Sequence, residues 1–130
     1  MAARLEGLSK EYGVRIVVGE ATVAAEPQTF VYRLLDLVAV KGRSEPLRCF
    51  EVMARAGALD AAGERRLARY HEALDLYHAR RWADAVRLLD ELGGEAPADG
   101  PIALYRRRAR ALLADPPADD WDGVFVADSK

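Results

Sequence analysis

The spacing of apolar residues changes near Ala54, and this change constrains the possible folds more than any other feature of the chain. Residues 58–114 carry apolar side chains three and four positions apart, a spacing that places them on one face of a helix. Residues 2–53 mix short helical patterns with β-branched and alternating runs that are typical of strands. We therefore predict an α+β chain in three parts, which are 1–53, 54–115 and a tail over 116–130.

The first part is predicted to be a small α/β unit with a β-hairpin. Pro27 ends its second helix, because the residue before a proline disfavours the helical conformation. The expected elements are a helix over 2–11, a strand over 15–18, a helix over 20–26, one strand or two with a bulge near Asp36 over 30–40, a turn over 41–46 and a strand over 47–52. Such a unit buries little apolar surface, so it would be marginally stable by itself.

The second part is predicted to contain three helices. Asp60 is a good N-cap for the first of them. The expected helices run from Asp60 to about Arg80, from Trp82 to Gly93-Gly94, and from Ile102 to a stop at Asp115-Pro116-Pro117. In the tail, Trp121 and Phe125 are expected to cover the apolar surface of these helices.

Charge and composition exclude several functional classes. The chain has 19 Lys and Arg residues against 21 Asp and Glu residues, and its net charge of −2 argues against a generally basic nucleic-acid binder. A single cysteine, Cys49, excludes an internal disulfide and a cysteine-based zinc cluster. No apolar run is long enough to span a membrane, and the first residues lack the apolar core of a signal peptide. We therefore expect a cytoplasmic chain that contacts neither nucleic acid nor membrane.

The remaining polar residues have simple structural interpretations. His71 and His78 are seven positions apart, whereas a metal pair on a helix needs a spacing nearer four and a third ligand. Cys49 is expected to be a small buried residue of a strand. The arginines at 106–108 and 110 are expected to form a solvated or salt-bridged face of a helix.

Residues 70–97 resemble one tetratricopeptide repeat. Small residues in such a repeat let two helices approach closely, and aromatic residues fill the groove between them. The match is carried by Ala73, Tyr77, Trp82, Ala85, Leu89 and Pro97, and it is best in the stretch RRWADAVRLLDEL. Because peptide-binding arrays generally need three or more repeats, the resemblance favours a helical hairpin over a binding array.

Residues 1–53 resemble the final third of a class III adenylate/guanylate cyclase catalytic domain. Two stretches carry the resemblance, A-A-R-L-E in the first helix and V-K-G-R-S-E-P-L-R-x-F-E-V at the hairpin. The later stretch LLADPPADDWDGV is similar to the extension on some bacterial members of that family. The resemblance implies an incomplete ferredoxin-like, cyclase-type segment followed by the tetratricopeptide-like helical hairpin.

The same resemblance assigns roles to two residues. Arg4 corresponds to the arginine of an Asn-x-x-x-Arg motif, which stabilises charge on the α-phosphate of ATP while the 3′-hydroxyl displaces pyrophosphate. A guanidinium suits this role, because its fixed fork of donors meets the charge on phosphoryl oxygens. Lys41 corresponds to the lysine that binds the terminal phosphates. The resemblance thus implies Arg4 as a catalytic residue and Lys41 as a substrate-binding residue, with adenylate cyclase favoured over guanylate cyclase.

Other parts of the family's site have no match in this sequence. The asparagine of the motif would fall one position before Met1, and no acidic pair in residues 1–53 matches the two aspartates that hold Mg²⁺ or Mn²⁺ in the family. Family enzymes form their site between two catalytic domains, so the complete enzyme would pair with a second cyclase domain as a homodimer. We therefore expect a C-terminal cyclase fragment that holds no metal cofactor and makes no cyclic AMP alone.

Two other hypotheses stay open on the sequence. One is an interaction module of tetratricopeptide type, which predicts an exposed apolar groove on the helical hairpin instead of a groove filled by Trp121 and Phe125. The other is a remnant without function, whose half-sheet would leave an unpaired edge.

Overall fold

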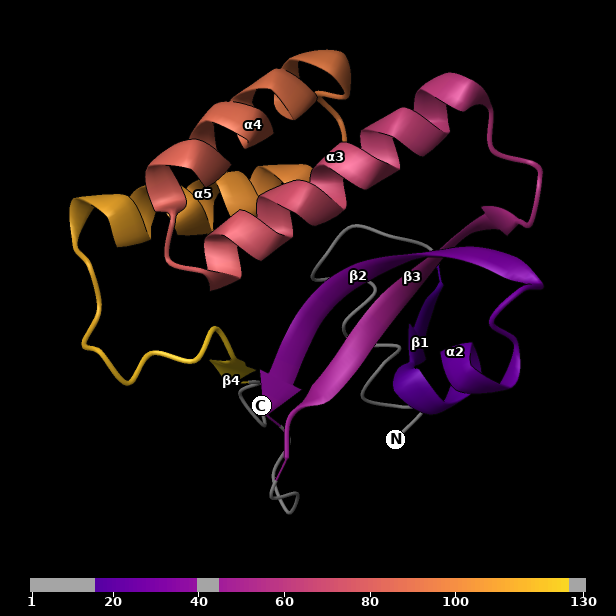
Figure 1. Cartoon of the computed structure of the whole chain (residues 1–130), viewed down its shortest axis with the longest axis horizontal. Coiled ribbons are helices and arrows are strands. Elements are labelled where there is room, and N and C mark those ends of the chain that lie inside the picture. Colours follow the sequence, from indigo (N-terminus) through magenta and orange to yellow (C-terminus); the bar gives the residue numbers. More distant parts are fainter. Residues whose placement is uncertain (1–15, 40–44, 127–130) are drawn as a thin grey trace. The chain divides into compact units, whose positions relative to one another are not determined.

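The computed structural model describes residues 16–39 and 45–126, which form two compact units. One unit, here called the sheet unit, comprises the residues up to Leu59 together with Gly123–Lys130. The other, the helical unit, comprises Asp60–Asp122. The sheet unit combines strands with a short helix and the helical unit contains three helices (Figure 1), so the chain is α+β as the sequence predicts.

The sheet unit is built on a four-stranded sheet in the order β1-β3-β2-β4. The strand β3 is antiparallel to both of its neighbours, β1 and β2, whereas β4 runs parallel to β2. The bounds are Val17–Gly19 for β1, Phe30–Ala39 for β2, Leu47–Arg55 for β3 and Phe125–Val126 for β4, with the helix α2 at Glu20–Ala25 between β1 and β2. The two long strands β2 and β3 form the expected hairpin, and α2 packs against β1 and β3.

The strand β2 is continuous and carries a bulge beside Asp36. Leu34 pairs with Phe50 and Asp36 pairs with Cys49, so one extra residue, Leu35, is inserted in β2 relative to β3. The bulge changes the phase of the strand, and Leu35 and Asp36 are therefore both buried although they are neighbours in sequence. The sequence left open one strand or two; the structure shows one strand, and the predicted bulge near Asp36 is confirmed.

The helical unit contains the predicted three helices, α3 at Ala61–His78, α4 at Trp82–Glu95 and α5 at Gly100–Ala114. The helix α4 packs against both α3 and α5. Asp60 caps α3 by accepting a hydrogen bond from the Gly63 N–H at 2.7 Å, which confirms the predicted N-cap. The buried core side chains come from all three helices: Tyr70, Ala73, Leu74, Tyr77, Trp82, Ala85, Leu89, Leu92, Ile102, Tyr105 and Ala109.

The predicted end of α4 at Gly93-Gly94 is wrong. The helix continues to Glu95, and the Ala96 N–H still donates to the Leu92 carbonyl at 2.9 Å. Neither glycine has a positive φ, so neither uses the left-handed conformation that ends many helices. Pro97 ends α4 instead, because the residue before a proline is driven out of the helical conformation, and Ala96 has φ −135° and ψ 70°.

The expectation that Phe125 covers the helical unit is not tested, because the structure describes the backbone of this residue and not its side chain. Phe125 lies in β4, where its backbone pairs with Val38 of the sheet unit. Gly123, with φ 76°, precedes this strand in a conformation that favours glycine. The predicted helix over 2–11 and most of the predicted turn over 41–46 lie outside the described residues. Within the described part of the chain, no helix is long and apolar enough to cross a membrane.

Candidate functional site

The two predicted site residues, Arg4 and Lys41, both lie outside the described residues. The strands on either side of Lys41 are described. Lys41 is the second residue after β2, and β3 begins at Leu47, which pairs with Val38 near the end of β2. The structure therefore describes the two strands that flank the segment to which the resemblance assigns phosphate binding.

A row of polar side chains occupies one face of this hairpin. Arg33 pairs with Glu51, and Asp36 pairs with Cys49 two residues along β3. Partners in an antiparallel pair point to the same face of a sheet, and so do residues two apart in one strand. The four side chains Arg33, Asp36, Cys49 and Glu51 therefore share a face, and we call them the hairpin polar cluster.

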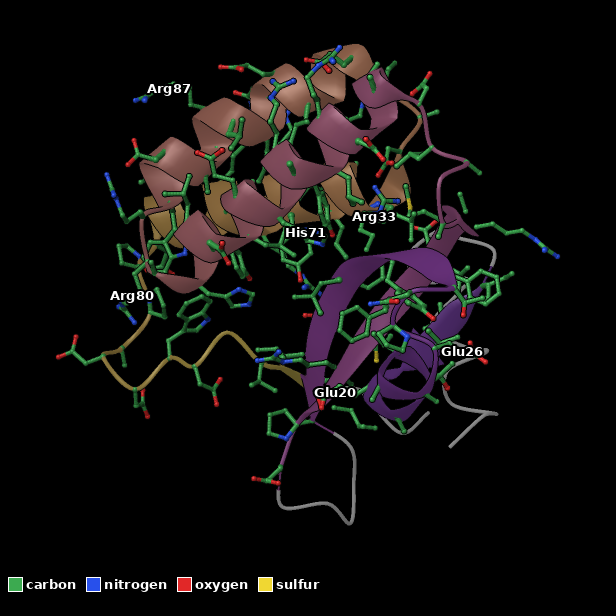
Figure 2. The ribbon with its side chains drawn as sticks, turned by 45° about the vertical axis from the view of Figure 1, so that its right-hand side comes forward. Glu20, Glu26, Arg33, His71, Arg80 and Arg87 are labelled. Atoms are coloured by element: carbon green, nitrogen blue, oxygen red, sulfur yellow. The ribbon has the colours of Figure 1, made fainter. Side chains whose placement is uncertain are left out.

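Arg33 and Glu51 form a buried ion pair within this cluster. The Arg33 Nε and Nη2 atoms donate to the same Glu51 Oε1 atom at 2.9 and 2.5 Å. The two side chains are only 6% and 14% exposed, and Figure 2 labels Arg33 on β2. Removing two charges from water costs several kcal/mol per ion, so such a pair contributes more to a unique strand register than to net stability. Because a slip of one residue would separate the pair, it fixes the register of β2 against β3.

Asp36 and Cys49 complete the cluster at the bulge. Asp36 is 1% exposed, and its Oδ1 atom accepts a hydrogen bond from the Leu37 N–H at 2.9 Å. Burial, together with the nearby Asp36 carboxylate, raises the pKa of the Cys49 thiol to about 11. The thiol is therefore protonated near neutral pH and is a poor nucleophile, which confirms Cys49 as a small buried residue and not a reactive one.

The cluster was not predicted as a unit. Its signal in the sequence is the presence of Arg33 and Asp36 in an otherwise apolar run from 30 to 40, where an unpaired charge would be costly. Among residues 16–39 and 45–126, no group of three or more His, Cys, Asp or Glu side chains is arranged to hold a metal ion. We therefore assign no metal ligand to the described part of the chain.

In the helical unit the charged residues join helices. Arg106 and Arg110 of α5 reach Asp90 of α4 at 2.7 and 3.0 Å, which confirms the salt-bridged alternative for these two of the four arginines. Arg69 of α3 reaches Glu91 and Glu95 of α4 at 3.0 and 2.6 Å. The Arg69 hydrogen bond lowers the pKa of Glu95 below its ordinary value. These exposed pairs contribute little to stability individually.

The predicted histidines lie against aromatic rings. The ring of His71 meets Tyr70 edge-on with centroids 5.6 Å apart, and His78 meets Tyr77 at 5.2 Å. These contacts agree with the structural interpretation of both side chains.

Arg80 joins α3 and α4 in an unusual conformation. The Arg81 N–H donates to the Leu76 carbonyl at 2.9 Å and the Arg80 N–H donates to the Tyr77 carbonyl at 3.1 Å, which is the Schellman pattern of a helix C-terminus. In this pattern Arg80 takes the position usually held by glycine, and its φ is 66°. A non-glycine residue in this conformation costs roughly 1 kcal/mol, so a contact of the side chain has to offset the strain.

The Arg80 side chain makes that contact with the chain after α5. Its guanidinium carbon lies 5.1 Å from the ring centre of Trp82 and 5.8 Å from that of Trp121. Its Nη1 and Nη2 atoms donate to the carbonyls of Ala118 and Pro117 at 3.1 and 3.0 Å. Figure 2 labels Arg80 at the end of α3 beside this segment. Trp121 itself meets Tyr77 and Trp82 edge-on, with centroids 5.4 Å apart in each case.

Comparison with known proteins relates the chain to adenylate cyclases. An adenylate cyclase of Dictyostelium discoideum, named terminal-differentiation specific, is 32% identical over 120 residues, which cover 83% of this chain. An adenylate cyclase of Anabaena cylindrica is 42% identical over 57 residues, which cover 42% of this chain. The chain spans 5% of the first relative and 11% of the second. No protein-family model and no solved structure matches the chain.

Proposed function

We propose that this chain is the C-terminal part of a class III adenylate cyclase, with its hairpin contributing to the ATP site. The support is the sequence relation to two proteins named adenylate cyclase, together with the antiparallel pairing of β2 and β3, the strands on either side of the V-K-G stretch. The observation that carries the proposal is the pairing of Val38 with Leu47. These two residues flank the segment that contains Lys41.

In the proposed reaction the 3′-hydroxyl of ATP attacks the α-phosphorus and pyrophosphate leaves, which gives cyclic AMP. Lys41 would hold the terminal phosphates as a point charge, and Arg4 would stabilise the charge that develops on the α-phosphate. Mg²⁺ or Mn²⁺ would neutralise phosphate charge in the complete enzyme. Because the described residues include no matching carboxylate cluster, we derive no step of this chain through the metal.

The hairpin polar cluster gives this proposal a structural basis. A phosphate-binding lysine must be held within about 0.5 Å of its productive position, and a long two-stranded hairpin by itself is only marginally stable. The Arg33–Glu51 pair fixes the register of β2 against β3, and the bulge at Leu35 fixes which side chains face the buried side. The cluster is thus a positioning element for the turn and touches no substrate itself.

The 130-residue chain by itself is proposed to be inactive. The two metal-binding aspartates of the family have no counterpart in residues 1–53, and family enzymes build each site from two catalytic domains. The partner we propose is a second cyclase domain, and the location we propose is the cytoplasm, where ATP is supplied.

A complementation assay tests this function. The chain is mixed with a cyclase domain that keeps its metal aspartates but has lost the arginine of its Asn-x-x-x-Arg motif, and cyclic AMP is measured with Mn²⁺-ATP. We expect activity that falls by at least about 100-fold in Arg4→Ala and Lys41→Ala chains, as when one transition-state contact is removed. Arg87→Ala is the matched control, because its side chain is 72% exposed on α4. Equal activity in all four chains, or none with the unmodified chain, would refute the proposal.

The interaction-module hypothesis gains no support from the packing of the helical unit. Trp121 lies against Tyr77 and Trp82 of the helical hairpin, so a segment of the same chain already contacts these aromatic rings. We therefore propose no peptide-binding function for this unit.

A further inference from the structure

The segment after α5, residues 115–122, belongs to the helical unit and lies against the turn between α3 and α4. Arg80 of that turn donates to two carbonyls of the segment at 3.1 and 3.0 Å. Its guanidinium carbon lies 5.1 Å from the ring centre of Trp82 and 5.8 Å from that of Trp121. The Trp121 ring also meets the Trp82 ring edge-on, with centroids 5.4 Å apart. The guanidinium and the Trp121 ring therefore both lie against Trp82.

The turn carries a strain that glycine would avoid. Arg80 has a φ of 66°, and glycine adopts this conformation without the steric cost that a side chain adds. What arginine contributes at this position is therefore its guanidinium, which contacts Trp82 and the segment after α5. The contacts that hold the segment also hold the strained backbone in place.

The same arrangement leaves a buried donor unsatisfied. The Trp82 side chain is 6% exposed, and its Nε1 atom is buried with no hydrogen-bond partner among residues 16–39 and 45–126. A buried N–H group without an acceptor costs the free energy of removing it from water. Uncovering the ring would let water accept this hydrogen bond, so the cost is recovered when the segment moves away.

The segment is weakly attached compared with the core of the helical unit. Residues 115–122 contain no helix or strand, and a backbone hydrogen bond within them joins the Trp121 N–H to the Ala118 carbonyl at 3.1 Å. The buried core comes from the three helices, and α4 packs against both of the others. A segment with few contacts opens at a lower free energy than a packed core unfolds.

We propose that Arg80 and residues 115–122 form a latch that opens while the three helices stay folded. In the closed state the guanidinium and the Trp121 ring cover Trp82, and their cation–π and aromatic contacts offset the strained turn and the unpaired indole N–H. In the open state the indole N–H of Trp82 is hydrated, and the Tyr77 ring loses its contact with Trp121. All of these residues belong to the helical unit, so the latch is independent of the proposed cyclase function.

Hydrogen exchange of the Trp82 indole N–H measures the opening of the latch in the full chain. Because this N–H has no hydrogen bond to another described residue, its burial is what slows exchange. The chain has two tryptophans and hence two indole signals by NMR, and Trp121→Phe identifies the Trp82 signal. We expect this signal to exchange at least about tenfold faster in Arg80→Gly and in Trp121→Ala. Trp121→Phe, which keeps an aromatic ring, should give a smaller increase.

Two controls separate the latch from the rest of the helical unit. Arg87→Ala removes a guanidinium that is 72% exposed on α4, and it should leave the Trp82 indole exchange unchanged. Leu89 is fully buried in α4, so its amide reports on the core. That amide should change by less than roughly twofold in the latch variants, because local opening leaves the core folded.

Three results would overturn the proposal. Unchanged indole exchange in Trp121→Ala would show that the segment does not cover Trp82. Equal acceleration of the Trp82 indole and the Leu89 amide would show that the whole unit unfolds, so that no separate latch exists. Faster exchange in Trp121→Ala but not in Arg80→Gly would show that the guanidinium does not hold the segment.

Discussion

Replacing Glu51 with glutamine tests whether the hairpin polar cluster holds the sheet unit together. The substitution keeps the size of the side chain and removes the negative charge that both Nε and Nη2 of Arg33 contact. The Arg33 side chain is 6% exposed, so water has little access to take the place of the lost carboxylate while the sheet stays closed. The expected result is a more frequent opening of β2 and β3.

The burial of the Arg33–Glu51 pair sets how much stability the substitution Glu51→Gln should remove. Breaking a buried ion pair by removing one partner costs about 3–5 kcal/mol. Glu51 is 14% exposed, which allows some relaxation toward water and places the expected loss near the lower end, at about 3 kcal/mol. Because 1.4 kcal/mol corresponds to a factor of ten, the opening equilibrium should rise by roughly 100-fold.

The lone cysteine provides the assay. Cys49 belongs to the sheet unit and is 1% exposed, so a thiol reagent reaches it only when the sheet opens. Its raised pKa is caused by burial and by Asp36, and Glu51 is not among the causes, so the substitution changes labelling through opening and not through acidity. The two tryptophans, Trp82 and Trp121, both lie in the helical unit, and their fluorescence reports that unit separately.

A double-mutant cycle supplies the controls. Replacing both partners, as Arg33→Met with Glu51→Leu, removes both buried charges and should recover most of the lost stability. Asp84→Asn removes a carboxylate that ion-pairs on the surface of α4, and labelling should change less than about threefold. If Glu51→Gln also changes labelling by less than threefold, the reasoning about the buried pair is refuted.

Three further predictions concern stability. Leu89→Ala removes a fully buried side chain of α4 and should lower the unfolding free energy of the helical unit by about 3 kcal/mol. Urea unfolding monitored by tryptophan fluorescence measures this loss, and a loss below about 1 kcal/mol would contradict the core assignment. The pKa of the Cys49 thiol is raised to about 11 in the folded state, so the thiol ionises at lower pH in the unfolded state and the unfolding free energy should fall as pH rises from about 9 to 11. Cys49→Ala should remove this fall with pH, and an unchanged pH dependence would exclude the thiol as its source. Asp60→Ala should cost about 1 kcal/mol in the same urea experiment, whereas Asp60→Asn, which keeps the capping oxygen, should cost only a few tenths.

The elements that local chemistry determines could be predicted from the sequence. The Asp60 cap, the termination of α2 before Pro27 and the bulge near Asp36 each depend on residues within a few positions, and the structure confirms all three. Hydrophobic spacing likewise identified the three helices of the helical unit, because their buried faces repeat every three to four residues.

The features that depend on distant parts of the chain could not be predicted. The parallel pairing of Phe125 with Val38 joins residues separated by the whole helical unit, and no local pattern encodes it. The contact of Arg80 with the segment after α5 is equally remote in sequence. For the candidate site, the resemblance supplied Arg4 and Lys41, whereas the Arg33–Glu51 pair required the register of the strands.

The helix α4 includes Gly93 and Gly94, and glycine inside a helix makes the helical unit less stable than alanine at the same position would. Each helical glycine gives the unfolded chain conformational freedom that folding must remove, and neither residue uses that freedom in the folded state. A methyl group at position 94 would meet no atom within 4 Å, whereas one at position 93 would lie 3.5 Å from Arg106 Nη1. Gly94→Ala is therefore expected to stabilise the unit by about 0.4–1 kcal/mol in thermal unfolding. The last turn of α4, before Pro97, is therefore a place where one added methyl group is expected to increase the stability of the helical unit.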